Sequence, residues 1–134
     1  MEKELLNTFD KELLLKDLCA RLPYGVKVES VFINTDTKKR KSCGIEVFYA
    51  TCILMIRDGF GEFKPYLFPL SSMTEKQKKE YQYITERWMN DPSYSIISDS
   101  IDWLNENHFD YRGLIEKGLA IDATGTDIYA VPEE

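Results

Sequence analysis

The sequence predicts an α+β fold, in which a helix precedes a small antiparallel sheet and further helices follow it. Three observations carry this prediction. Apolar residues recur at helical spacing over 1–22, strand-like patterns dominate 26–70, and helical spacing returns over 72–118. Runs of strand followed by runs of helix favour this class over a parallel α/β sheet. The length favours a single domain over 1–134, which ends in a short strand and a tail over 119–134.

The first element is an amphipathic helix. Its leucines and Phe9 recur at steps of three and four, and charged residues, Asp17 among them, fall mostly on the opposite face. The helix must stop at Leu22 because Pro23 follows, and proline cannot continue a helix. A turn is expected at the Pro-Tyr-Gly sequence that begins there.

Strands are expected next. The segment 26–34 alternates apolar and polar residues, and a polar loop with a basic run follows it. The segment 44–57 is rich in β-branched and aromatic residues but is too long for one strand, which predicts two strands with a break near Ala50. The pair Asp58-Gly59 is a hairpin signal. The result is a curled antiparallel sheet, for which closure into a barrel is an open alternative.

A stiff, extended connector over 64–74 leads from the sheet to the helices. Its two prolines restrict the backbone and cannot donate ladder hydrogen bonds. A capping box then starts a helix, and Thr74 with Gln77 fits it as well as Ser72 with Glu75 does. After an Asn-Asp-Pro break, a further helix is expected before the C-terminal part of the chain.

The composition argues against several function classes. A net charge of −6 argues against a nonspecific phosphate-binding surface, which needs clustered Lys and Arg. No apolar run approaches the roughly 20 residues of a membrane-spanning helix, and no signal-peptide pattern opens the sequence. The three cysteines, Cys19, Cys43 and Cys52, show no metal-ligand spacing. We expect them to be buried and reduced in a cytoplasmic protein.

His108 is the only histidine, and Asp110 lies two residues away. A carboxylate can orient an imidazole and raise its basicity, so a small hydrolase built on this pair is one alternative. No nucleophile signature such as G-x-S-x-G accompanies the pair, and a structural role at a helix C-terminus is the simpler explanation of His108. We therefore assign no catalytic residue, metal or cofactor, and a protein without enzymatic activity is favoured.

Arg112 stands in the compact group Asp110-Tyr111-Arg112-Gly113. An arginine beside aromatic residues can hold a carboxylate or a phosphate, and the alternative is a buried strut that pairs with an acidic residue of the same chain. The connector and this loop supply the residues of the first candidate binding surface, and whether the two segments meet in space is left open. Its members are Tyr66, Phe68, Ser71, Ser72, His108, Asp110, Tyr111 and Arg112.

The basic run is a second candidate surface, for nucleic acid. Its members are Lys38, Lys39, Arg40 and Lys41. Phe32, Phe48 and Tyr49 on the neighbouring strands could stack on the bases of a single strand. The net charge disfavours this alternative, and one basic run in an acidic chain is more often a solvated loop.

Four segments carry a resemblance to a known family. They are DLCARLPYGV at 17–26, KPYLFPLSSMT at 64–74, WLN at 103–105 and HFDYRGLIEKGLA at 108–120. Together they resemble a family of small proteins of unknown activity carried by phages and mobile elements of gut bacteria. The resemblance implies an accessory gene product in the bacterial cytoplasm, and it brings no activity, cofactor or catalytic residue.

The leading expectation is a small, non-enzymatic protein that binds a protein partner or a second copy of itself. Its aromatic residues are more numerous than one small core needs, and exposed aromatic residues are typical of protein interfaces. Such an accessory factor would modulate host machinery or a host defence. The nucleic-acid-binding module and the hydrolase remain the alternatives.

Overall fold

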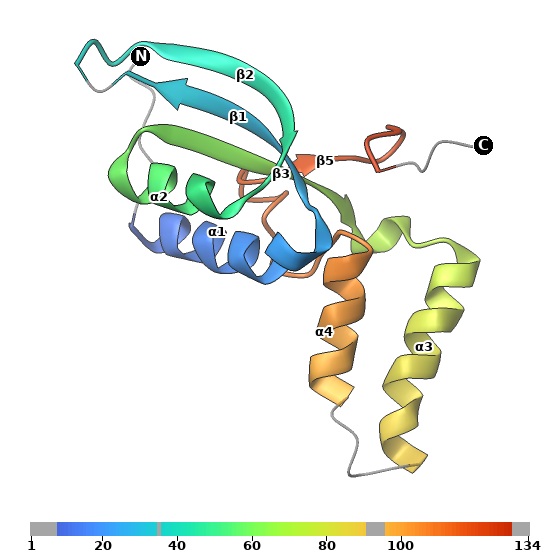
Figure 1. The fold of residues 1–134 in the computed structure, drawn as a ribbon. Helices are drawn as coiled ribbons and strands as arrows, with labels where there is room; N and C mark the ends of the chain where they lie inside the picture. Colours follow the sequence, from blue (N-terminus) through green and yellow to red (C-terminus); the bar gives the residue numbers. More distant parts are fainter. Residues whose placement is uncertain (1–7, 35, 91–95, 130–134) are drawn as a thin grey trace.

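The computed structural model describes residues 8–34, 36–90 and 96–129, and it has the predicted α+β order (Figure 1). In chain order the elements are α1 (Thr8–Arg21), the 3-10 helix η1 (Leu22–Tyr24), β1 (Lys27–Ile33), β2 (Arg40–Val47), α2 (Ala50–Asp58), β3 (Gly61–Pro69), the 3-10 helix η2 (Leu70–Ser72), α3 (Glu75–Asn90), α4 (Ile96–Glu106), β4 (Phe109–Asp110) and β5 (Ile121–Asp122). Helices α1 and α2 lie against one side of the sheet, and α3 and α4 project away from it as a pair.

The sheet is mixed and open, which corrects two expectations. Its order is β2-β1-β3-β4, and β5 also pairs with β3. Strand β1 is antiparallel to β2 and β3, as predicted, but β3 is parallel to β4 and β5. A parallel pair requires a long crossover, and the two helices between β3 and β4 supply it. The described strands do not close into a barrel.

The prediction of a second strand after Ala50 is wrong, because this segment forms α2. The predicted break near Ala50 does coincide with the point where the chain changes from strand to helix. Cys52 and Ile56, one helical turn apart, are buried against the rest of the protein. Gly59 ends the helix with a left-handed φ of 80°, and its N–H donates to carbonyls of the last turn. The Asp-Gly pair is thus a helix terminus instead of a hairpin turn, and burial of one helical face outweighs the β propensity of the isoleucines.

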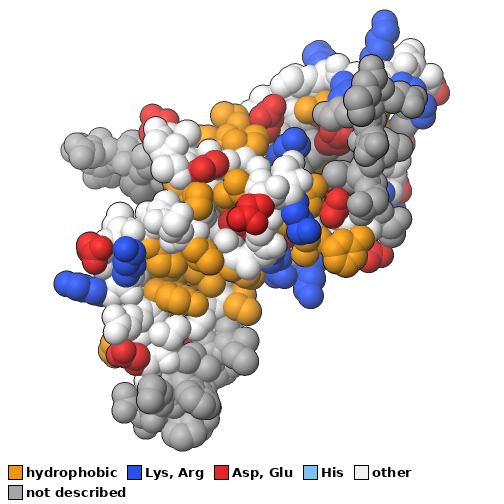
Figure 2. Space-filling view, turned by 180° about the vertical axis from the view of Figure 1, so that it is seen from behind, with side chains coloured by type: hydrophobic (Ala, Val, Ile, Leu, Met, Phe, Trp, Pro, Cys, Tyr) orange, Lys and Arg blue, Asp and Glu red, His pale blue; other side chains and the backbone are white. Residues whose placement is uncertain are grey.

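Two apolar clusters hold the elements together. The larger lies between α1, α2 and the sheet, and Phe48 meets Phe63 edge-on there with ring centres 6.0 Å apart. The smaller centres on Trp103, Leu104 and Phe109 and joins the α3–α4 pair to the end of β3. Figure 2 shows hydrophobic side chains on the surface where this helical pair meets the body. The fold therefore has a central core and a second contact area at one end.

Only one of the two possible capping boxes forms. The N–H of Thr74 donates to Oε1 of Gln77 at 2.9 Å, and the N–H of Gln77 donates to Oγ1 of Thr74 at 3.1 Å. The Ser72 hydroxyl donates instead to the carbonyl of Pro69, at 2.7 Å. Thr74 is therefore the residue that starts α3.

The expectation of three buried cysteines is correct only for Cys52. Cys19 and Cys43 are exposed. Cys19 lies next to the buried Leu18 on α1, but the helical rotation of about 100° per residue turns it to solvent. Within the described ranges, no helix is both long enough and apolar enough to cross a membrane.

Candidate functional site

The connector and the His108 loop meet in space, and they meet in the packed interior. Strands β3 and β4 run in parallel there, with Phe68 opposite Phe109 and Pro69 opposite Asp110. The N–H of Phe68 donates to the carbonyl of His108 at 2.8 Å, and Phe109 is almost fully buried. The first candidate surface is therefore largely a junction between elements instead of an open site.

A buried carboxylate organises this junction. Nε of Arg21 donates to Oδ2 of Asp17 at 2.8 Å, and Nε of Arg112 donates to Oδ1 of the same carboxylate at 3.1 Å. Nη2 of Arg21 also donates to the carbonyl of Phe109, at 2.7 Å. The side chains of Asp17 and Arg21 are both fully buried. The placement of Asp17 on the solvent side of the helix is thus wrong, because both oxygens of its carboxylate are bonded to arginines, which lets the charge be buried. Nη1 of Arg21 is buried without a hydrogen-bond partner in the described chain.

Tyr111 lies between the two arginines. Its ring centre is 5.1 Å from Cζ of Arg21 and 4.9 Å from Cζ of Arg112, within the range of cation–π attraction. Its hydroxyl donates to Oδ1 of Asn105 at 2.9 Å and lies 3.2 Å from Nη2 of Arg112. Arg112 therefore acts as the buried strut that the sequence left as an alternative, with Asp17 as its acidic partner.

Asp110 is bonded to the backbone of its own loop. Its Oδ1 accepts from the N–H groups of Arg112 and Leu114, and its Oδ2 accepts from the N–H of Ile115, at 3.0–3.2 Å. No hydrogen bond joins its carboxylate to His108, although the structure describes both side chains. The carboxylate fixes the turn after β4, and the predicted His–Asp pair is not assembled.

His108 is a neutral, stacked residue. Its ring lies 3.6 Å from the ring of Tyr129, centre to centre, and its Nδ1 is buried without a hydrogen-bond partner in the described chain. Burial, with smaller contributions from Arg21 and Lys27, lowers the pKa of His108 to about 4. The backbone N–H of His108 donates to the carbonyl of Asn105, a residue in the last turn of α4. A structural role at this helix end agrees with the geometry, but a neutral ring does not supply the cation expected there.

The remaining predicted residues are also structural or lack a chemical partner. Tyr66 is buried, and its carbonyl accepts a hydrogen bond of 2.7 Å from the Tyr129 hydroxyl. Ser71 is exposed, whereas Ser72 is bonded to Pro69. No group of three or more His, Cys, Asp or Glu residues that could hold a metal ion occurs among the described residues.

The basic run lies exposed on the hairpin between β1 and β2, and Figure 2 shows Lys and Arg side chains gathered at that end of the molecule. Arg40 forms an ion pair with Glu62. Of the predicted stacking residues, Phe48 is in the core, so it cannot stack on a base. Phe32 and Tyr49 remain accessible, with 43% and 50% of their surfaces exposed.

Sequence reasoning did not single out a row of exposed apolar residues at the end of β2. Ile45, Val47 and Tyr49 follow at steps of two, and 55%, 48% and 50% of their surfaces are exposed. Phe48 between them points into the core. Strand β2 is the last strand at its side of the described sheet, so this outer row, Ile45, Val47 and Tyr49, borders a free edge. The alternation was the available signal, but it does not indicate which strand faces solvent.

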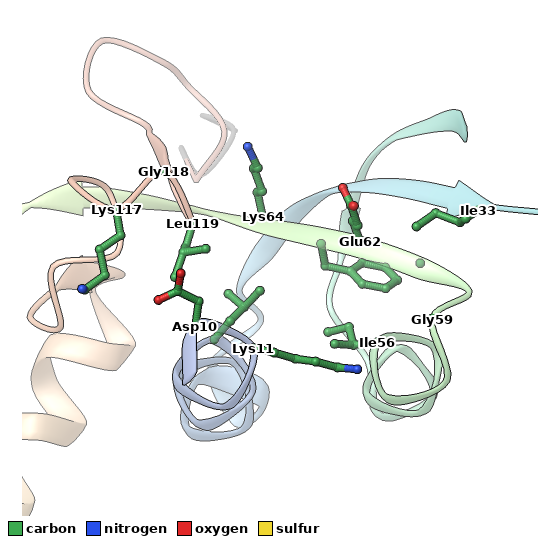
Figure 3. Close-up of a pocket in the computed structure, with 13 residues that line it drawn as sticks. Asp10, Lys11, Ile33, Ile56, Gly59, Glu62, Lys64, Lys117, Gly118 and Leu119 are labelled. Carbon is green, nitrogen blue, oxygen red and sulfur yellow. The ribbon is translucent and has the colours of Figure 1, made fainter. Parts of the chain in front are cut away.

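A cleft of about 310 Å³ lies between α1, the end of α2, the start of β3 and the segment 117–119 (Figure 3). Its floor is made of four buried apolar side chains, Leu14, Ile56, Phe63 and Leu119. Asp10, Lys11 and Lys117 lie around it on the helix side of β3, whereas Glu62 and Lys64 project from the other side of that strand. Ile33 of β1 also lines it. Because residues from separate parts of the chain build this cleft, no local motif could have predicted it.

Comparisons with models of protein families, with curated proteins and with solved structures find nothing that matches this chain. The resemblance to proteins of phages and mobile elements therefore stays a prediction.

Proposed function

We propose that this chain is a non-enzymatic accessory factor of a phage or mobile element, and that it binds a protein partner through the outer row Ile45, Val47 and Tyr49. The single observation that carries the proposal is the exposure of these three side chains at the free edge of the sheet, where Ile45 and Val47 lie on β2 and Tyr49 follows at the N-cap of α2. Single exposed apolar residues are common on protein surfaces, but a continuous row that includes an aromatic residue is typical of an interface.

The charge beside the row specifies the chemistry of the partner. Lys38, Lys39 and Lys41 are exposed on the adjoining hairpin, whereas Arg40 is already paired with Glu62. A partner that places apolar side chains against the row and acidic side chains against the hairpin would complement both. The partner is therefore a protein with an apolar segment flanked by Asp or Glu.

The edge strand favours contact through side chains over open-ended sheet extension. The register of β1 and β2 shifts between Ser30 and Val31, so Cys43 has no opposite residue and forms a bulge. Bulges and lysines on an edge strand oppose the indefinite pairing of edges. A limited contact over the outer row remains compatible with this protection.

The absence of enzymatic activity is supported by the bonding of the candidate catalytic groups. The carboxylate of Asp110 is occupied by three backbone N–H groups, and Arg112 is bonded to Asp17. His108 is neutral at pH 7 and stacked on Tyr129. A general base needs a proton-accepting group within reach of a substrate, and these side chains instead hold the junction together.

Site-specific photo-crosslinking in bacterial cells that carry the gene tests the proposal. A photoreactive residue at Val47 should capture one discrete protein, and the same residue at Leu70 should not. Leu70 is a matched control because 45% of its surface is exposed, close to the value at Val47, but it lies in η2, directly after the C-terminal end of β3. The captured protein, once purified, should bind the double variant Ile45→Asp, Val47→Asp at least roughly ten-fold more weakly, because a charge at the centre of an apolar contact is not compensated.

Three outcomes would overturn the proposal. Capture from Leu70 but not from Val47 would place the interface on the side of the helical pair. Capture of nucleic acid, lost when Lys38 to Lys41 are changed to Ala, would support the nucleic-acid alternative. Unchanged affinity of the purified partner for the double variant would show that the outer row is not the contact.

A further inference from the structure

The cleft beside α1 has the size and apolar floor of a small-molecule site. Its volume of about 310 Å³ lies at the lower end of the range in which proteins bind small ligands. The four floor residues, Leu14, Ile56, Phe63 and Leu119, are each at most 6% exposed, so the apolar surface is fixed by the core. Such a floor favours the apolar body of a ligand over water.

Glycines keep the cleft open. Gly59, Gly61 and Gly118 line it and contribute backbone alone. A Cβ at Gly61 would come within 2.9 Å of the Phe63 ring, and Gly59 and Gly118 have left-handed φ values of 80° and 75°. Gly61 is therefore required for space, and Gly59 and Gly118 are favoured by their backbone conformation. Because none of the three has a side chain, the cleft beside them is not filled.

The charges around the cleft are positive on balance, in a chain with a net charge of −6. On the helix side of β3 lie Lys11, Lys117 and Asp10 (Figure 3). Nζ of Lys11 donates to the carbonyl of Arg57 at 3.2 Å, so this side chain spans from α1 to the end of α2. Asp10 also has an interaction partner. The Lys117 ammonium makes no hydrogen bond or ion pair with any residue that the structure describes.

From this geometry we infer that the cleft binds a small amphiphilic carboxylate, with its apolar body on the floor and its anionic group at Lys117. One available ammonium beside an apolar cavity matches a ligand with a single negative charge at one end. A dianionic head would lie close to the Asp10 carboxylate, which disfavours it. This site is separate from the outer row, and it does not depend on the proposed protein partner.

Titration of the full chain with decanoate, followed by amide chemical shifts in NMR, tests the inference. We expect saturable shifts at Gly59, Gly61, Gly118 and Leu119. Decanol, which has no charge, should bind more weakly. The variant Lys117→Gln should weaken decanoate binding roughly five-fold or more, because the paired charge at a partly exposed mouth is lost.

Lys79→Gln is the matched control. It removes the same charge from an exposed lysine of α3 that does not line the cleft, so decanoate affinity should not change. The inference is wrong if decanoate causes no saturable shifts, if the shifts lie outside the cleft, or if decanol binds as tightly. An equal loss of affinity in Lys79→Gln and Lys117→Gln would also overturn it, because it would indicate nonspecific attraction by net charge.

Discussion

Nε of Arg112 donates to Oδ1 of Asp17 at 3.1 Å, across 95 positions of the sequence. Arg21 bonds to the other oxygen of the same carboxylate. The contact joins the first helix to the loop after β4, and all four segments that carry the family resemblance contribute residues to this junction, the connector through Phe68 and Pro69. The resemblance, which stays a prediction, therefore coincides with buried structural contacts, although two of its segments also line the cleft, at Lys64 and at 117–119.

Asp17→Asn should destabilise the protein strongly. The substitution leaves two guanidinium groups near a neutral amide, one of them fully buried, and breaking a buried ion pair in this way costs about 3 kcal/mol or more. Urea unfolding followed by circular dichroism measures the change. Asp58→Asn, which removes an exposed ion pair with Arg57, is the control and should leave the midpoint nearly unchanged. A midpoint for Asp17→Asn equal to that of the control would show that the junction does not hold the fold.

His108 should make the protein less stable in mild acid. Its pKa is about 4 in the folded protein, against 6.5 for an unperturbed histidine. Between these values the unfolded chain binds the extra proton, so the free energy of unfolding falls as the pH falls from about 6.5 to about 4. The loss that this one group contributes is roughly 3 kcal/mol at the acid end of the window.

His108→Asn isolates this effect, because carboxylates also titrate near the acid end of the window. Asn tolerates the left-handed φ of 63° at this position, and it does not titrate. Urea midpoints measured at several pH values between 4 and 7 should therefore fall less steeply in the variant. Parallel curves for the two proteins would mean that His108 is not held neutral by burial.

The fold class could be predicted because the long periodic segments agree with the final structure. The β1 alternation and the capping box at Thr74 depend on neighbours in sequence, and local physics fixes them. The α1 stripe is correct for Leu14 and Leu18, which are buried, but wrong for Phe9, whose surface is 70% exposed. The segment after Ala50 could not be assigned, because a short apolar run fits a buried strand and a buried helix equally well. The parallel pairing of β3 with β4 depends on how α3 and α4 pack, because these helices bring the chain back beside β3. No local sequence pattern specifies that packing.

The candidate site was harder to predict than the fold. The sequence leaves open whether the segments that contain Tyr66 and Arg112 meet in space, and aromatic and charged residues look alike in sequence whether they line a site or hold a junction. What decides between the two is the acidic partner, and Asp17 lies far away in the chain. The cleft could not be predicted because residues from separate parts of the chain line it, and its glycines contribute backbone, which carries no chemical signature.

Thr74→Ala should lower the free energy of unfolding by about 1 kcal/mol, which is typical for the loss of an N-cap. The Thr74 hydroxyl oxygen accepts from the N–H of Gln77, and that N–H would lose its partner. Ser72→Ala is the control, because its hydroxyl donates to Pro69 and does not cap α3, so its effect should be smaller. Urea unfolding compares the two. A larger loss in Ser72→Ala would mean that η2, and not the capping box, determines where α3 starts.

Thiol labelling should distinguish Cys52 from the other two cysteines. Cys19 and Cys43 are exposed and should react with a disulfide reagent in the folded protein, whereas Cys52 is buried in the central core. Burial also raises the pKa of Cys52, so less of the reactive thiolate is present at neutral pH. Two thiols should therefore react quickly, and the third only after urea unfolding. Cys43→Ser should reduce the fast count to one, and Cys52→Ser should leave it at two. Fast reaction of all three thiols would show that α2 opens readily from the sheet.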